Sequence, residues 1–212
     1  MRTNVSFIRT MHSSTRGVGV IYNFCGETKG KTSSALGTIL RALGAGKKVR
    51  AVFFMKHWNT SETQFLRKIK RLEEFDIDFF QSGDKDFIYV EGVNKASLDE
   101  AQEQLRFGKV HERDLTDIEK AKRGLKKAQS FLAEKPFLLV LDELNYALQF
   151  GLIPYEDVEQ LLDEADEQGV HVIITGKHVP ARLKKRCDLV TEMKKIKHPF
   201  DKGIYGVRGL DY

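Results

Sequence analysis

The chain has 212 residues, of which 41% are hydrophobic and 31% are charged, and its formal net charge is +5. A chain of this length and apolar content can bury one good core, so we expect one globular domain. Every apolar run falls well short of the roughly 20 residues that span a bilayer, which excludes a membrane-spanning helix. The two cysteines, Cys25 and Cys187, are far apart and in no metal-ligand spacing, so we expect a reducing cytoplasm and no disulfide framework.

The basic excess is mild and dispersed along the chain. Pairs such as Arg67-Lys68 and Lys126-Lys127 stand among acidic residues, on what read as solvated helix faces. An anionic small ligand explains a charge of this size as well as a nucleic acid does. We therefore do not expect nucleic acid as a partner.

Residues 1–17 form the first distinct segment. They contain three arginines and no acidic residue, because the first acid of the chain is Glu27. A targeting presequence has this composition, but the segment is short and lacks a clear cleavage signal. We expect a flexible basic arm that becomes ordered over an anionic ligand or a partner subunit. Persistent disorder is the alternative.

Residues 18–212 read as one α/β domain. Apolar runs predict strands at residues 18–24, 49–54, 77–80, 87–90, 137–141, 170–174 and 189–193. Amphipathic stretches predict helices at residues 32–45, 61–72, 118–132, 154–165 and 180–187, and capping boxes are expected at residues 61–64 and 97–100. Residues 93–114 are polar and read as an insertion that adds little core. Strands that alternate with helices predict a mainly parallel sheet.

A loop with two glycines joins the first predicted strand to the first predicted helix, and it reads Gly26-Glu27-Thr28-Lys29-Gly30-Lys31-Thr32-Ser33. The first N–H groups of a helix lack internal partners and carry partial positive charge, so such a loop is suited to hold phosphates. Lys31 can reach phosphate oxygens, and the Thr32 hydroxyl is placed to ligate Mg²⁺. The spacing departs from the usual P-loop, because the position of its first glycine is taken by Cys25. With this loop, we predict a P-loop NTPase-like (RecA-like) three-layer α/β fold.

Charged side chains also follow two later strands. Asp142 and Glu143 come directly after the strand at residues 137–141, and Lys177 follows the strand at residues 170–174. In an open α/β sheet the ligand crevice lies at the carboxyl ends of the strands, so we expect one acid to hold Mg²⁺ and the other to orient a reacting group. Capping of the next turn is the alternative for either acid, and a strand-end turn is the alternative for Lys177. His198, near the C-terminus, reads as a packed or surface histidine or as a ligand.

Several blocks of the sequence together resemble a known family. Beside the loop they are Leu141-Asp142-Glu143-Leu144-Asn145-Tyr146, Ile173-Ile174-Thr175-Gly176 and Asp188-Leu189-Val190-Thr191-Glu192-Met193. The most specific block runs from Ile196-Lys197-His198-Pro199-Phe200-Asp201-Lys202-Gly203 to Gly209-Leu210-Asp211-Tyr212. From about residue 18 to the end, with a thin match over residues 57–135, the chain resembles the P-loop corrinoid adenosyltransferases of the BtuR/CobA class.

The resemblance implies a particular reaction, in which the adenosyl group of ATP passes to the cobalt(I) of a reduced corrinoid and inorganic triphosphate is released. It implies that residues 26–33 bind the nucleotide together with Lys177 and His198, and that Lys31 and Glu143 are the catalytic residues. Thr32 and one of Asp142 or Glu143 would hold the Mg²⁺. The resemblance also implies a homodimer, and the need for a reduced corrinoid points to a reductase or flavoprotein electron donor.

The loop differs from the pattern usual in that family, Gly-Asn-Gly-Lys-Gly-Lys-Thr, because Glu27 and Thr28 replace asparagine and glycine. A carboxylate beside a triphosphate is repulsive unless it points outward or meets the metal. Lys177 stands where the family usually has arginine, so the charge is kept and bidentate phosphate contact is lost. Two other functions remain open: phosphoryl transfer by an NTP hydrolase or kinase, and a non-enzymatic nucleotide-binding module in which Glu27 has disabled the site.

Overall fold

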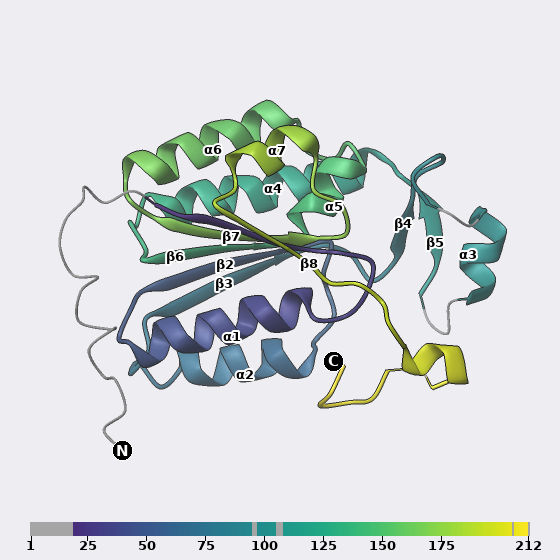
Figure 1. Cartoon of the computed structure of the whole chain (residues 1–212), viewed down its shortest axis with the longest axis horizontal. Helices are drawn as coiled ribbons and strands as arrows, with labels where there is room; N and C mark the ends of the chain where they lie inside the picture. Colours follow the sequence, from purple (N-terminus) through teal and green to yellow (C-terminus); the bar gives the residue numbers. More distant parts are fainter. Residues whose placement is uncertain (1–18, 95–96, 105–107, 205, 212) are drawn as a thin grey trace, which may run out of the picture.

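The computed structural model describes residues 19–94, 97–104, 108–204 and 206–211 (Figure 1). The basic arm expected at residues 1–17 lies outside the described residues. Among the helices of the described part, none has the length and apolar character needed to cross a membrane.

The centre of the fold is a six-stranded sheet with the order β3-β2-β6-β7-β1-β8. Its strands are β1 (Ile21–Cys25), β2 (Val49–Phe54), β3 (Ile77–Ser82), β6 (Leu138–Asp142), β7 (His171–Gly176) and β8 (Leu189–Glu192). Every neighbouring pair is parallel. A second sheet pairs β4 (Phe87–Tyr89) with β5 (Val110–Glu112), also in parallel.

Helices cover both faces of the large sheet, which gives three layers (Figure 1). One face carries α1 (Lys31–Gly44) and α2 (Ser61–Lys70). The other carries α4 (Leu115–Leu132), α5 (Leu144–Gln149), α6 (Tyr155–Glu167) and α7 (Ala181–Arg186). The short helix α3 (Leu98–Gln104) lies beside β4 and β5, away from the large sheet, and a 3₁₀ turn, η1 (Pro199–Lys202), lies in the C-terminal stretch.

The core consists of two apolar layers separated by the sheet. All six residues of β2 are buried, and they alternate between the layers. Val52 and Phe54 pack on the α4 side, whereas Ala51 and Phe53 pack on the α1 side. This alternation follows from the period of two in a strand, and burial on both faces explains the apolar runs that predicted a parallel sheet.

The structure confirms each predicted strand and helix within a few residues and adds α3, β5 and α5. The capping box at residues 97–100 is confirmed, because the Ser97 N–H donates to Glu100 Oε2 at 2.8 Å and the Glu100 N–H donates to Ser97 Oγ at 3.3 Å. The box expected at residues 61–64 is wrong. The helix starts at Ser61, one residue earlier than its Ser-x-x-Gln pattern suggests, so its N-cap is Thr60 and not Ser61. The Thr60 side chain makes no capping bond.

The strand order brings the two polar segments of the sequence together. β7 is the one strand between β1, which leads into the glycine-containing loop, and β6, which ends at Asp142. Since all of these strands are parallel, their carboxyl ends lie at one edge of the sheet. The fold is therefore the predicted three-layer P-loop NTPase-like α/β fold, and the loop lies at the carboxyl edge of the sheet, the edge where such folds bind their ligands.

Gly124→Ala is expected to lower the free energy of unfolding by about 1–3 kcal/mol, the usual cost of overpacking a core. Gly124 is buried in α4, where a Cβ would lie 2.7 Å from Ser82 Oγ and 2.8 Å from Phe54 Cε1. The matched control is Gly37→Ala in α1, where a Cβ would meet nothing within 4 Å. This control should raise stability by roughly 0.5–1 kcal/mol through helix propensity. Urea unfolding measures both, and equal effects would contradict the packing described for α4.

Candidate functional site

The loop between β1 and α1 is held by two glycines with different roles. Gly26 has a φ of 125°, its N–H donates to the Lys177 carbonyl at 2.8 Å, and a Cβ there would lie 2.2 Å from the Met193 carbonyl oxygen. Gly30 is the N-cap of α1 with a φ of 114°, but a Cβ there would meet only a side-chain atom at 3.5 Å. Gly26 is therefore required by space and conformation together, and Gly30 by conformation alone.

Most of the predicted binding residues line one hollow of about 330 Å³, which we call the phosphate-loop hollow. Its walls are Glu27, Thr28, Lys29, Gly30, Lys31, Thr32, Ser33, Glu143, His198, Leu210 and Asp211. Three predicted site residues lie outside this set. Gly26 donates its N–H to the Lys177 carbonyl, and the Lys177 ammonium lies near Glu27. Asp142 accepts a hydrogen bond from Thr32.

The predicted lysine and threonine of the loop contact different partners. Lys31 Nζ donates to the Thr28 carbonyl at 2.8 Å, so the side chain lies along its own loop. Thr32 Oγ1 donates to Asp142 Oδ2 at 3.3 Å and accepts a hydrogen bond from Lys56 Nζ at 3.0 Å. Thr32 thus connects the start of α1 to the ends of β2 and β6.

Asp142 is a fully buried carboxylate whose two oxygens are both engaged. Oδ1 accepts from Thr175 Oγ1 at 2.7 Å, and Oδ2 accepts from Lys56 Nζ at 2.5 Å and from Thr32. Thr175 Oγ1 also accepts from the Glu143 N–H at 2.9 Å, which ties the end of β6 to β7. A buried charge is tolerated only when it is paired and hydrogen-bonded, and this set meets that condition.

Glu143 differs from Asp142 in its backbone conformation and in its hydrogen bonding. Its backbone is left-handed, with a φ of 61°, which is uncommon outside glycine. Burial, followed by the charge of Asp142, raises the pKa of the Glu143 carboxyl to about 7, although Lys56 and Lys31 oppose the shift. Its Oε2 is buried and has no hydrogen-bond partner among the described residues. Such an atom points to a ligand group that completes the site.

A larger pocket of about 510 Å³ adjoins the phosphate-loop hollow, and Glu143 lines both. We call it the large pocket; its apolar walls include Met55, Trp58, Phe87, Ile88, Tyr146 and Phe150. Lys56 lines it as well. Burial, followed by the charges of Glu143 and Glu27, raises the pKa of Tyr146 to about 12, so its hydroxyl keeps its proton at neutral pH. Part of the wall comes from Asn94, Ala101 and Val110, within the segment predicted as an insertion.

The C-terminal stretch contacts the phosphate loop and lines the phosphate-loop hollow. Lys29 Nζ donates to Asp211 Oδ1 at 2.6 Å, and Leu210 lines the hollow beside it. His198 also lines the hollow, but its Nδ1 accepts from the Phe200 N–H at 3.1 Å, which caps the turn η1. One ring nitrogen of His198 is therefore used structurally, and Nε2 is the one left to face a ligand.

The unusual Glu27 has a cation nearby. Its Oε1 lies 3.7 Å from Lys177 Nζ, and the Glu27 side chain is 50% exposed. The lysine that replaces the family's usual arginine thus faces the acid that replaces its usual asparagine. The pair reduces the repulsion expected between Glu27 and a bound polyphosphate.

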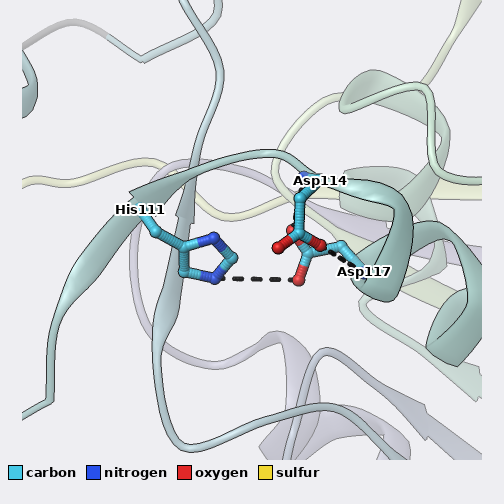
Figure 2. A group of neighbouring side chains, drawn as sticks. All are labelled: His111, Asp114 and Asp117. Atoms are coloured by element: carbon cyan, nitrogen blue, oxygen red, sulfur yellow. Dashed lines mark hydrogen bonds and ion pairs between the residues drawn. The ribbon is translucent and has the colours of Figure 1, made fainter.

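Figure 2 shows a second group of ionisable side chains, His111, Asp114 and Asp117, near the start of α4. The two carboxylates form a capping box, in which the Asp117 N–H donates to Asp114 Oδ1 and the Asp114 N–H donates to Asp117 Oδ2, both at 3.0 Å. His111 Nε2 lies 3.7 Å from Asp117 Oδ1. Capping the helix accounts for both acids.

Sequence reasoning missed Lys56, Thr175 and Asp211 as site residues. Lys56 lies just beyond β2 with no motif around it, and the parallel pairing of β2 with β6 alone brings it to Asp142. Thr175 belongs to the block Ile173-Ile174-Thr175-Gly176, and its hydroxyl at the end of an apolar strand could have indicated a site residue. Asp211 stood in the most specific block, but that block carried no expectation of a contact.

The residues present fit a magnesium ion. A hydroxyl and a carboxylate oxygen, Thr32 Oγ1 and Asp142 Oδ2, lie 3.3 Å apart, and hard oxygen donors of this kind are what Mg²⁺ prefers. The Lys56 ammonium hydrogen-bonds to both oxygens. A cationic group thus already contacts Thr32 and Asp142, two of the three residues that the sequence analysis named as candidate metal ligands.

The fold and the loop at its carboxyl edge define a P-loop NTPase-like α/β protein. Comparison with protein families is more specific, because residues 17–212 match the family described as ATP:corrinoid adenosyltransferase BtuR/CobO/CobP. The chain belongs to this family.

Individual relatives agree with the family match. A corrinoid adenosyltransferase of Pseudomonas aeruginosa is 32% identical over 198 residues, which cover 92% of this chain and 84% of that protein. A corrinoid adenosyltransferase of Escherichia coli is 32% identical over 196 residues, or 92% of this chain and 86% of that protein. Corrinoid adenosyltransferase CobA of Salmonella typhimurium is 31% identical with the same coverage. A solved DNA replication initiation factor has a TM-score of only 0.30 and 12% identity over 79% of this chain and 47% of its own, too weak a likeness to carry an argument.

Glu143→Gln is expected to stabilise the protein more at high pH than at low pH. Because the pKa of Glu143 is raised from 4.5 to about 7, the neutral form is favoured on folding, and that stability is lost as the pH rises through 7. The gain in unfolding free energy should be larger at about pH 8 than at about pH 5 by on the order of 2 kcal/mol.

The control for this measurement is Glu119→Gln on the exposed surface of α4. This variant should show no such pH dependence. A gain for Glu143→Gln that is the same at both pH values would mean that Glu143 ionises in the folded protein without penalty.

Proposed function

We propose that this chain transfers the 5′-deoxyadenosyl group of ATP to the cobalt(I) of a reduced corrinoid and releases inorganic triphosphate. The observation that carries the proposal is that the phosphate-loop hollow and the large pocket meet at Glu143. A polyphosphate in the first and a large, mostly apolar ring system at the second would bring the ribose 5′ carbon to their junction. Family membership supports the same pair of substrates.

The chemistry asks little of protein side chains. The electron pair of cobalt(I) attacks the 5′ carbon, a cobalt–carbon bond forms, and the bond from that carbon to the first phosphate oxygen breaks. Both electrons of the broken bond leave with the triphosphate, and the cobalt becomes formally cobalt(III). No proton has to be removed, so the site needs positioning, exclusion of water and stabilisation of the leaving group.

The binding roles follow from the placement of each residue. The N–H groups from Gly26 to Ser33 and the Lys31 ammonium would hold the triphosphate, and His198 would contact it from the C-terminal stretch. Thr32 and Asp142 would hold Mg²⁺, which when bound neutralises charge on the phosphate oxygens. Glu143 would use its unpaired Oε2 to orient the reacting groups at the junction. Lys177, whose Nζ lies 3.7 Å from Glu27 Oε1, would reduce the repulsion between Glu27 and the bound triphosphate.

Further expectations concern the protein's surroundings. Cobalt(I) must be generated by an electron donor, so a reductase or flavoprotein is the proposed partner, and a homodimer is proposed from the family pattern. A cytoplasmic location agrees with Cys25 and Cys187, which are both free thiols. The basic arm at residues 1–17 is proposed to become ordered over bound substrate. The insertion at residues 93–114 is proposed to form part of the wall of the large pocket.

An ATP analogue with nitrogen bridging the last two phosphates should still serve as an adenosyl donor. The bond that breaks in adenosyl transfer is at the 5′ carbon, and the analogue leaves that bond unchanged. A kinase or hydrolase breaks the terminal phosphorus–oxygen bond, so the same analogue would stall it. The measurement is the light-sensitive spectrum of the adenosylated corrinoid, together with the identity of the phosphate product.

The outcome distinguishes the candidate functions. Adenosylated corrinoid with both donors, together with triphosphate from ATP and the nitrogen-bridged imidotriphosphate from the analogue, supports the proposal. Turnover of ATP to phosphate, with complete failure of the analogue, would establish phosphoryl transfer instead. Binding of ATP with no product of either kind would leave only a nucleotide-binding module.

Thr32→Ala is expected to weaken binding of Mg²⁺-ATP by about ten- to a hundredfold, as losses of single charge-assisted contacts do. The hydroxyl contacts Asp142 Oδ2 at 3.3 Å at a helix start where alanine is otherwise tolerated. The control is Thr38→Ala in the same helix, whose hydroxyl only bonds the Ser34 carbonyl at 3.0 Å. Calorimetric titration with and without Mg²⁺ measures the effect, and unchanged Mg²⁺ dependence would contradict the assignment of Thr32.

A further inference from the structure

Lys56 stands at the boundary between the two cavities. Its Nζ lies 2.5 Å from Asp142 Oδ2 and 3.0 Å from Thr32 Oγ1, both on the phosphate-loop side. The same side chain lines the large pocket and is 25% exposed, while Asp142 is fully buried. Lys56 is therefore an ammonium group shared by the nucleotide side and the apolar side of the site.

Two acids lie near this ammonium. Its Nζ forms an ion pair with Asp142 Oδ2 at 2.5 Å, and the charge of Glu143 acts on it as well. Lys31, the other lysine close to this junction, donates to the Thr28 carbonyl within its own loop and lines only the phosphate-loop hollow of the two cavities. The two lysines thus face different cavities.

A bound Mg²⁺ would change the contacts of Lys56. Thr32 Oγ1 and Asp142 Oδ2 lie 3.3 Å apart, and a metal ion held by them would compete with the ammonium for both oxygens. Lys56 also lines the large pocket together with Glu143, at the junction where the adenosyl carbon would lie.

We propose that Lys56 is a catalytic residue of adenosyl transfer that stabilises the leaving triphosphate at the phosphate next to the ribose. This inference rests on the proposed function. As the bond from the 5′ carbon to the phosphate oxygen breaks, negative charge develops on that oxygen, and the Lys56 ammonium donates a hydrogen bond to it. Lys56 keeps its proton throughout, and the electron pair stays on the triphosphate.

The test is Lys56→Gln, with Lys56→Arg as the charge-retaining variant. Glutamine can still donate hydrogen bonds to Asp142 and Thr32, so it preserves much of the ground-state arrangement while removing the charge. We expect Lys56→Gln to lower kcat for adenosylation by about a hundredfold or more, the usual loss for one preorganised stabilising group. The dissociation constant of Mg²⁺-ATP, measured by calorimetry, should change by no more than about threefold. Lys56→Arg should retain kcat within about tenfold, because arginine keeps the charge at a site that needs no exact fork geometry.

The matched control is Lys70→Met at the end of α2, whose ammonium lies 2.5 Å from Asp78 Oδ1 and lines neither cavity. It removes the same charge from a pair of the same length and should leave kcat unchanged. Unchanged kcat in Lys56→Gln would overturn the proposal. So would a weakened Mg²⁺-ATP affinity with kcat retained, which would make Lys56 a positioning residue for Thr32 and Asp142.

Failure of the underlying function gives a different result. If the unaltered protein makes no adenosylated corrinoid with ATP and a chemically reduced corrinoid, the proposed function fails before Lys56 is tested. If it does, and only the variants disagree with expectation, the inference about Lys56 alone is wrong. Thermal unfolding of each variant confirms that the compared proteins are folded.

Discussion

The site depends on one buried carboxylate, that of Asp142. It is fully buried at the end of β6, and it is stable there only because Lys56, Thr32 and Thr175 all donate to it. These partners come from the chain after β2, the start of α1 and the end of β7. The hydrogen bonds of one charge therefore hold together the segments that form the floor of the site. Loss of a single partner would leave a buried charge incompletely paired, which costs far more than the bond itself contributes in water.

The neighbouring acid illustrates how position decides chemistry. Asp142 has a cation and two hydroxyl donors, whereas the Oε2 of Glu143 has no hydrogen-bond partner among the described residues, and burial raises the pKa of this carboxyl to about 7. Its left-handed backbone, at a φ of 61°, carries strain that the surrounding contacts must offset. Strain and an unsatisfied polar atom at the meeting point of two cavities are features that proteins retain at functional sites.

Much of this arrangement was predictable from the sequence because it is local. The phosphate loop and the Asp142-Glu143 pair each follow an apolar run, and parallel strands bring such ends to one edge. Lys56 was not predictable, because its bond to Asp142 joins residues 86 positions apart and requires β2 to lie beside β6. The large pocket was missed for a related reason. The strand at residues 87–90 was predicted, but its partner β5 has only three residues, too few to show periodicity, so residues 93–114 read only as a polar insertion.

The phosphate loop by itself does not distinguish adenosyl transfer from phosphoryl transfer, because both reactions need the same cradle for a polyphosphate. What differs is the group that must lie beside it. A hydrolase needs a water molecule beside the terminal phosphate, and a carboxyl whose pKa is raised to about 7, as that of Glu143 is, suits a general base, so this carboxyl alone favours neither reaction. A reaction whose nucleophile is a metal electron pair needs no base, but it needs an apolar surface wide enough for the corrinoid and a cation near the bond that breaks. The large pocket has apolar walls, and the Lys56 ammonium lies at its boundary with the loop, which is why we proposed these roles for them.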